Sequence, residues 1–217
     1  MLPPFNGLCH RGGIACTFKL FSVMSDTYTT ITLEGTGVYT EKRSKFLAFA
    51  HHADSVEQAK RIIDGYRKKY YDARHCCYAY KIGFDEPSVR VNDDGEPSST
   101  AGKPIMGQIV SHELDNVVVC VVRYYGGVNL GTGGLIVAYR TAAALAIENS
   151  KTEEKLICEQ VSFRFPYVRM NDVMRVVKEM KAKVTSQQFG NDCSLTLDIR
   201  RTLAPQLKNR LQQLRLT

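Results

Sequence analysis

The stretch Val117–Leu135 reads VVVCVVRYYGGVNLGTGGL and decides the fold class. Its first six residues are all apolar, which is typical of a central strand buried on both faces. From Leu135 onward, apolar residues recur at helical spacing and predict a well-buried helix that ends near Asn149. A strand, a glycine-rich turn and a helix in succession indicate a protein of mixed α and β structure.

The turn between this strand and this helix holds five glycines within nine residues. The first amides of a helix lack intrahelical partners and lie at the positive end of its dipole, and glycines leave them sterically open. Such a turn binds phosphate, sulfate or carboxylate well. The alternative is tight packing against the sheet, with a threonine as a simple helix cap. The residues expected to bind an anion or nucleic acid are Lys103, Arg123, Tyr124, Gly126, Gly127, Gly131, Thr132, Gly133 and Gly134.

The turn matches neither the spacing of a P-loop nor a dinucleotide-binding fingerprint, so a nucleoside triphosphate site is not expected. A second polar segment, NDDGEPSSTAGKP at residues 92–104, precedes another predicted helix. Asp93, Asp94 and Glu96 could hold Mg²⁺ or act as acid and base. Because no histidine, cysteine or serine completes a catalytic set at a defined offset, we favour a polar turn and expect no metal and no cofactor.

Local patterns predict the remaining elements of the first 150 residues. Ser55–Gln58 forms a capping box that starts an amphipathic helix carrying Val56, Ala59, Ile62, Ile63 and Tyr66. Gly37–Ala50 predicts either two short strands or one long bent strand, and Cys76–Ile82 predicts another strand. We expect a loop over Gly83–Gly102 and a helix from Pro104 to about His112.

The pattern restarts near residue 151. A strand over Leu156–Phe165, a helix over Asn171–Lys181, a hairpin and a closing helix over Pro205–Leu216 give a βαββα order. This order lacks one final strand of a ferredoxin-like unit. The hairpin pairs Val184–Phe189 with Leu195–Ile199 through Gly190-Asn191-Asp192. We therefore predict a disordered or mis-assigned arm over residues 1–23, a first domain over 24–150 and a ferredoxin-like domain over 151–217.

Charge is unevenly distributed along the chain, whose formal net charge is +7. Residues 1–150 carry an excess of +1, whereas residues 151–217 carry an excess of +6. A basic surplus in the last third indicates a polyanionic partner such as RNA or a ribosome, although a solvated charged surface explains it equally well. No apolar run approaches the roughly 18 residues of a membrane-spanning helix, so we expect no membrane contact.

The seven cysteines include no C-x-x-C pair. Cys76 and Cys77 are neighbours in a predicted strand, so their side chains should point to opposite faces and cannot share one metal. Reduced cysteines that pack as small apolar side chains favour a cytoplasmic protein. Oligomeric state is not indicated by any pattern.

Two blocks, Asp93–Pro104 and Val121–Leu135, resemble the YigZ/IMPACT family. The similarity covers about Gly37–Ser150, and the tail from about Lys155 is similar to the small second domain of bacterial YigZ proteins. The resemblance implies a first domain with the fold of a ribosomal-protein domain and of a domain in elongation factor G, followed by a ferredoxin-like domain. The resemblance also implies that eukaryotic members carry a different N-terminal domain and restrain a starvation-responsive kinase; the similarity does not include that domain, so the regulatory role is not expected to transfer.

Three functions follow as hypotheses. The leading one is a non-catalytic protein that contacts RNA or the translation machinery through the glycine turn and the basic tail. The rival is a metal-assisted hydrolase or transferase acting on a phosphorylated small molecule through the Asp93–Glu96 carboxylates. A protein-interaction module is the third, and it requires a large exposed apolar patch. A loop over Asp93–Glu96 that lies against the Gly126–Gly134 turn would indicate one composite site.

Overall fold

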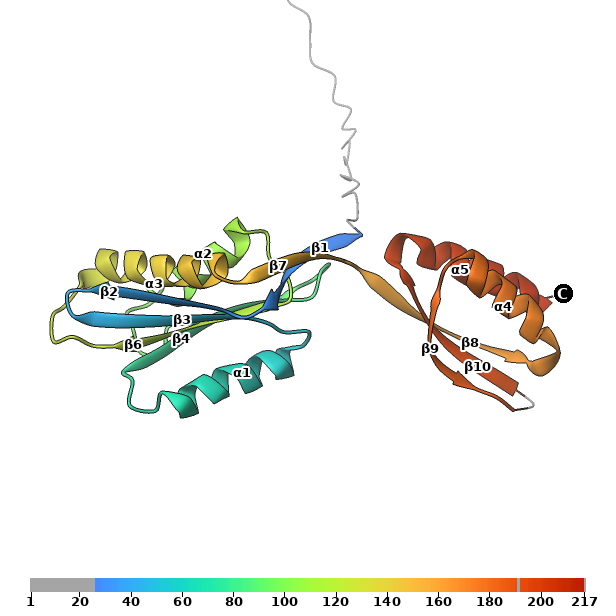
Figure 1. Cartoon of the computed structure of the whole chain (residues 1–217), viewed down its shortest axis with the longest axis horizontal. Helices are drawn as coiled ribbons and strands as arrows, with labels where there is room; N and C mark the ends of the chain where they lie inside the picture. The colour runs from blue at the N-terminus through green and yellow to red at the C-terminus, as the bar shows by residue number, and fades with distance from the viewer. Residues whose placement is uncertain (1–25, 191, 217) are drawn as a thin grey trace, which may run out of the picture.

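The computed structural model describes residues 26–190 and 192–216, and its larger unit is built on a five-stranded sheet (Figure 1). The strand order is β2-β3-β6-β4-β5, and every neighbouring pair is antiparallel. The buried strand predicted from the valine run lies at the centre. The strands are β2 (Gly35–Glu41), β3 (Ser44–His52), β4 (His75–Ile82), β5 (Ser88–Asn92) and β6 (Val117–Tyr124).

Helices cover both faces of this sheet. The helices α2 (Gly102–Ser111) and α3 (Gly131–Glu148) pack on one face, and α1 (Val56–Lys69) packs on the other (Figure 1). Because side chains alternate along a strand, Val119 joins the core under α3 while Val118 joins the core under α1. This two-sided burial explains why β6 is apolar throughout.

The predicted capping box at the start of α1 is present. Ser55 Oγ accepts from the amide of Gln58 at 3.2 Å, and Gln58 Oε1 accepts in return from the amide of Asp54 at 2.9 Å. The cysteine prediction also holds, because Cys77 lies in the core under α3 and Cys76 in the core on the other side. Within the described part of the chain, no helix combines the length and apolar character that a bilayer crossing requires.

A two-stranded ribbon links the larger unit to a smaller one. In it, β1 (Thr27–Leu33) pairs antiparallel with β7 (Lys151–Leu156), and the chain then enters the smaller unit (Figure 1). That unit has the antiparallel strand order β8-β10-β9, with α4 and α5 on one side. Its elements are β8 (Cys158–Pro166), η1 (Tyr167–Arg169), α4 (Met170–Glu179), β9 (Lys183–Gln188), β10 (Asp192–Arg200), η2 (Arg201–Leu203) and α5 (Ala204–Leu216).

The mixed α+β class is therefore confirmed, as is the βαββα order of the smaller unit. The likeness of the two units to a ribosomal-protein domain and a ferredoxin-like domain stays a prediction, as do the boundaries at 24–150 and 151–217. The arm predicted over residues 1–23 lies outside the described residues, and so does Asn191 of the predicted hairpin turn.

Two predicted segments are corrected, and one open alternative is decided. The loop expected over Gly83–Gly102 contains β5, an edge strand whose Val89 and Val91 are exposed and so show no burial pattern. Of the two alternatives for Gly37–Ala50, the two strands are confirmed, and a tight turn joins them. The strand expected from Leu156 is divided, because β7 belongs to the ribbon and β8 begins two residues later at Cys158.

Candidate anion-binding site

A buried arginine lies at one end of the central strand. Val119, Val121 and Arg123 follow one another on the α3 face of β6, so the charged side chain continues an apolar row. Arg123 is 5% exposed. Its Cα partners on the neighbouring strands are Phe46 of β3 and His75 of β4, and these three residues form a row across the sheet.

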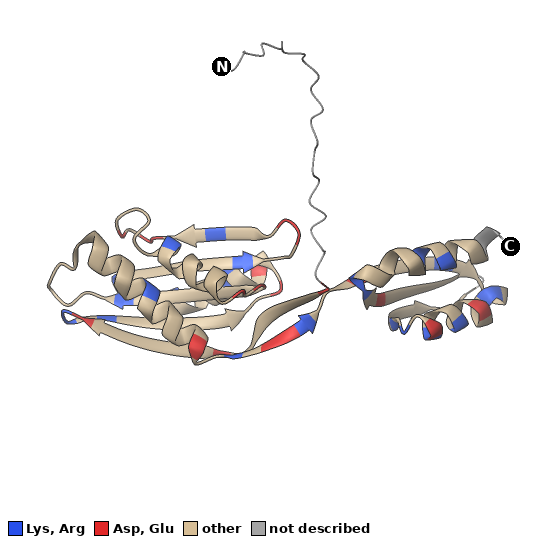
Figure 2. Cartoon of the chain, turned by 90° about the horizontal axis from the view of Figure 1, so that it is seen from above, with Lys and Arg blue, Asp and Glu red and all other residues tan. Residues whose placement is uncertain are grey.

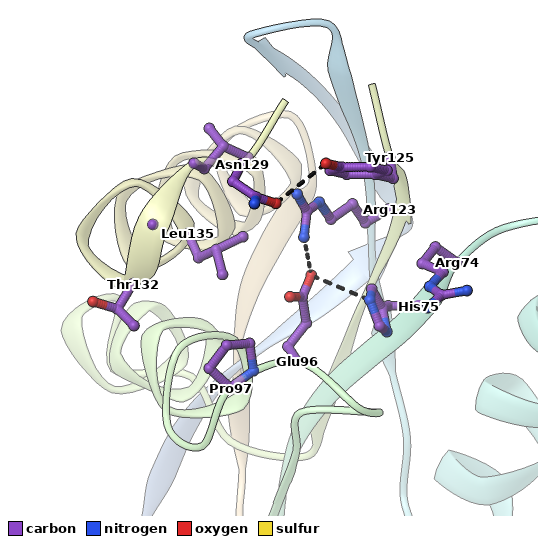
Figure 3. Close-up of a pocket in the computed structure, with 11 residues that line it drawn as sticks. Arg74, His75, Glu96, Pro97, Arg123, Tyr125, Asn129, Thr132 and Leu135 are labelled. Carbon is purple, nitrogen blue, oxygen red and sulfur yellow. Dashed lines mark hydrogen bonds and ion pairs between the residues drawn. The ribbon is translucent and has the colours of Figure 1, made fainter. Parts of the chain in front are cut away.

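Glu96 lies over this row and compensates its charge (Figure 3). Arg123 Nη1 donates to Glu96 Oε1 at 2.6 Å, and the hydroxyl of Tyr139 on α3 donates to the same oxygen at 2.8 Å. His75 Nε2 lies 3.8 Å from that oxygen. The other ring nitrogen of His75 donates to the carbonyl of Asp94 at 2.7 Å, because a carbonyl only accepts. Burial of its hydroxyl raises the pKa of Tyr139, so this group stays a donor.

The guanidinium of Arg123 lies between two aromatic rings. Its central carbon is 5.5 Å from the ring centre of Phe46 and 5.4 Å from that of Tyr125. Ser44 Oγ accepts weakly from Nη2 at 3.4 Å. The buried Nε has no hydrogen-bond partner among the described residues. Arg123 thus lines the cavity, but Glu96 already balances its charge, and its predicted role in anion binding stays a prediction.

A cavity of about 730 Å³ opens beside this cluster (Figure 3). The first turn of α3 forms one of its sides. Leu130 occupies the cap position of α3 without a side-chain hydrogen bond, so the first amides of the helix are not capped by a side chain. The lining residues are Arg74, His75, Glu96, Pro97, Arg123, Tyr125, Asn129, Leu130, Gly131, Thr132 and Leu135.

The five glycines of the turn have different roles. Gly126 is a packing glycine, because a Cβ there would lie 2.1 Å from the backbone of Arg43. Gly127 and Gly131 have φ angles of +80° and +72°, which glycine adopts without strain. A Cβ at Gly134 would lie 3.1 Å from the side chain of Leu130. At Gly133 a Cβ would meet nothing within 4 Å, so neither packing nor backbone conformation requires a glycine there.

The two aspartates of the acidic loop are structural. Asp93 accepts from the amides of Ser99, Ala101 and Gly102 at 2.8, 3.0 and 2.8 Å, and so closes the turn before α2. Burial opposes ionisation of Asp93, but these three amides outweigh it and hold its pKa below the usual value. Asp94 accepts from the amide of Cys76 at 2.7 Å and pairs with Arg67 at 3.1 Å.

The loop thus lies against the glycine turn through Glu96, and the two segments form one composite site. However, Asp93, Asp94 and Glu96 have separate protein partners and do not converge. Across residues 26–190 and 192–216, no three histidine, cysteine, aspartate or glutamate side chains are grouped as metal ligands. The acidic loop matches the polar-turn interpretation better than the metal-binding one.

Two other predicted residues lie at the margin. Lys103 is exposed on the first turn of α2 and does not line the cavity. Tyr124 directs its hydroxyl to Asp72 at 2.9 Å. Sequence patterns missed Arg74 and Tyr139. Arg74 lines the cavity because it directly precedes β4, and Tyr139 of α3 donates a hydrogen bond to Glu96. Arg74 is exposed and has no ion pair with a described residue.

The hairpin turn beside the cavity displays further cations. Lys42 and Arg43 form a two-residue turn with φ angles of +44° and +63°, where asparagine and glycine are usual. Both are exposed, like Lys45, the Cα partner of Tyr124. Figure 2 shows this turn as a basic tip at the left end of the larger unit. Strained non-glycine residues cluster at functional sites, and Arg43 of this turn lies against Gly126.

Comparison with known proteins places these features in a wider group. Residues 42–147 match the family profile described as the Impact N-terminal domain. The chain is 33% identical over 150 residues to the IMPACT family member YigZ of Escherichia coli (strain K12), covering 68% of this chain and 74% of that protein. It is 43% identical over 132 residues to an IMPACT family member of Thermus thermophilus, covering 61% and 70%. A crystal structure described as a hypothetical protein superposes with a TM-score of 0.70 at 28% identity, covering 87% of this chain and 93% of that one.

Proposed function

The chain belongs to the IMPACT family, and we propose that it is a non-catalytic protein that binds RNA and acts in translation. The proposed contact is the α3 cavity together with the basic tip beside it. RNA is the partner of choice because it offers a regular series of phosphates, and the ribosome displays RNA at high density.

One observation carries the proposal. The first turn of α3 has no capping side chain and lines the cavity through Gly131 and Thr132, and the next residue, Gly133, is also exposed. Uncapped amides at the positive end of an 18-residue helix favour a phosphate oxygen. Arg74 at the cavity adds a charge that no described carboxylate neutralises.

The surroundings of the cavity suit a single strand of nucleic acid. Arg43 and Lys45 lie beside the glycine turn and could follow a phosphate backbone. Tyr125 is 48% exposed and lines the cavity, where a base could stack on its ring. Aromatic side chains between free cations are the usual features of single-strand binding surfaces.

The basic tail supports this proposal less than its charge suggests. Four of its cations already pair with carboxylates: Arg200 with Asp26, Arg201 with Asp85, Lys208 with Glu159, and Arg210 with Glu179. We therefore place the main contact on the larger unit. The alternative of a metal-assisted hydrolase or transferase has less support, because its three carboxylates are engaged separately.

A salt titration of RNA binding tests the proposal. Binding of a fluorescent single-stranded RNA should weaken steeply with salt, with a slope of log K against log salt of about −0.7 for each phosphate contacted. The double variant Lys42→Asn with Arg43→Gly should bind more weakly and reduce the slope by about 1.4, since it removes two phosphate contacts. This variant also supplies the preferred turn sequence, so it should fold at least as well as the parent.

The matched control removes two cations elsewhere. Lys60 and Arg61 are exposed on α1, on the opposite face of the sheet. Lys60→Asn with Arg61→Gln makes the same change in net charge and should leave the slope unchanged. Absence of RNA binding at low salt, or equal loss in both double variants, would contradict the proposed contact.

A further inference from the structure

The carboxylate of Glu96 has one oxygen that the protein does not use. Its Oε1 accepts from Arg123 and Tyr139, whereas its Oε2 has no hydrogen bond to any described residue. The side chain is 3% exposed, so it has little freedom to turn toward bulk water. Figure 3 shows this second oxygen directed away from His75 and toward the side of the cavity formed by α3.

An ionised carboxylate oxygen accepts hydrogen bonds and cannot donate them. Because Glu96 lines the cavity, this oxygen is open to the cavity, which is therefore suited to a ligand that brings a donor to this position. The amides at the start of α3 are donors and require an acceptor. A ligand that suits the cavity therefore has a donor, such as a hydroxyl or amine, on the side of Glu96. It has an anionic acceptor on the side of Gly131–Gly133.

A bare phosphate satisfies only one side, because the free oxygen of Glu96 repels a second anion. A ribonucleotide unit satisfies both, since its 2′-hydroxyl lies next to the phosphate in the backbone. The same hydroxyl is the group by which proteins distinguish RNA from DNA. At about 730 Å³ the cavity falls in the range of sites that enclose one small molecule or one nucleotide.

We propose that the α3 cavity binds the ribose-phosphate unit of RNA, with the 2′-hydroxyl donating to Glu96 Oε2 and the adjoining phosphate accepting from the amides of Gly131–Gly133. This inference rests on the proposed function and adds to it a preference for RNA over DNA. Arg123 and Tyr139 act as positioning residues, because they hold the other oxygen of Glu96 and leave Oε2 facing the ligand.

The test compares oligonucleotides of one sequence that differ at the sugar. Oligouridylate of about ten nucleotides, a length within the usual site size, is titrated by fluorescence anisotropy as RNA, as DNA and as 2′-fluoro RNA. The 2′-fluoro sugar keeps the RNA pucker but has no hydroxyl to donate. We expect RNA to bind at least about tenfold more tightly than both other forms, the value of one charge-assisted hydrogen bond.

The outcomes separate this inference from the proposed function. Equal binding of all three oligonucleotides leaves RNA binding intact and overturns the hydroxyl contact. If 2′-fluoro RNA binds like RNA while DNA binds weakly, the protein recognises sugar pucker, and the contact is again overturned. Absence of binding by every oligonucleotide at low salt contradicts the proposed function itself.

Two further measurements locate the contact. The variant Glu96→Gln should reduce the ratio of RNA to DNA affinity toward one, with its folding checked by circular dichroism. Because this variant disturbs Arg123, the comparison of oligonucleotides on the unmodified protein remains decisive if the variant does not fold. Uridine monophosphate serves as the fourth ligand and should compete only far above the RNA concentration; competition by the free nucleotide at concentrations equal to those of RNA would overturn the assignment of the contact to a unit within an RNA strand.

Discussion

Arg123 continues a row of valines and is buried, so its charge depends on a single carboxylate for compensation. Removing one member of a buried ion pair leaves the other charged and unpaired, which costs about 3–5 kcal/mol. We predict that Arg123→Met lowers the free energy of unfolding by that amount, measured by urea denaturation. The double variant Arg123→Met with Glu96→Leu should recover much of the loss, because replacing both members with apolar groups is often close to neutral.

The exposed Arg43 is the control for this prediction. Arg43→Met removes the same type of side chain from the surface and should change stability by less than about 0.5 kcal/mol. A loss below about 1 kcal/mol for Arg123→Met, which is small for a buried pair, would mean that the Arg123–Glu96 pair is not the stabilising contact described here.

The contribution of Asp93 to the free energy of unfolding should depend on pH. Although its burial opposes ionisation, three amides lower its pKa in the folded chain below the usual value, so the folded chain releases this proton more readily than the unfolded chain. Its contribution is therefore present above the unfolded pKa of about 4 and is lost as pH falls through the folded pKa. Asp93→Asn should lower the free energy of unfolding at pH 7 by about 2 kcal/mol, the scale of hydrogen bonds to a charged group.

Urea unfolding of the parent and Asp93→Asn at a series of pH values checks this prediction. The difference in stability between the two proteins should shrink as the solution is acidified below about pH 4. A difference that stays constant or grows on acidification would show that the charge of Asp93 does not stabilise the turn before α2.

Single-residue roles were only partly predictable from sequence. The glycine turn indicated its open amides directly, because glycine and helix periodicity are local signals. The pairing of Glu96 with Arg123 is not local: it needs β6 to lie beside β4 and the acidic loop to fold over both. Likewise, a metal-binding role for Asp93 stayed an alternative to the favoured polar turn, because its three amide partners converge only once the turn has formed.

At the level of elements, helix stability and anion binding make opposite demands on the first turn of α3, since a side chain stabilises the helix but covers the amides. Gly133 lies in the helix with open space around it, and alanine is a better helix former than glycine by about 0.5–1 kcal/mol. We predict that Gly133→Ala raises the melting temperature and weakens RNA binding, since a methyl group then occupies the approach to the exposed amides. Such a trade between stability and function is common at binding sites.

Gly107 in α2 provides the matched comparison. It is also an exposed helical glycine whose Cβ would meet nothing within 4 Å, but it lies in the middle of α2, whereas Gly133 directly follows Gly131 and Thr132, which line the cavity. Gly107→Ala should raise the melting temperature by a similar amount and leave RNA binding unchanged. Equal RNA affinity of both variants and the parent would contradict the assignment of the first turn of α3 as the contact.

Elements with a strong pattern were predictable, and edge elements were not. The helices α1 and α3 and the strand β6 bury one or two continuous faces, which the spacing of apolar residues reveals. β5 is paired on one side only and exposes its valines, and β7 carries mostly charged residues because it forms part of a thin ribbon. Neither strand buries enough apolar surface to produce a period in the sequence.

On the scale of the whole molecule, the two units have separate apolar cores and are joined by the β1–β7 ribbon (Figure 1). The composition predicted the basic surplus of the last third but not its distribution, since several of those cations pair with carboxylates. The cavity, the free cation Arg74 and the basic tip all belong to the larger unit. We accordingly expect the larger unit to carry most of the RNA affinity.

The most direct test is a titration of the isotopically labelled protein with single-stranded RNA, followed through its backbone amide resonances. We expect the largest shifts at the amides of Gly127 and Gly131–Gly133, with smaller shifts around Arg74 and the Lys42–Arg43 turn. Shifts confined to the smaller unit, or amides of Gly131–Gly133 that do not respond while RNA is bound, would contradict the claim that the start of α3 holds the phosphate.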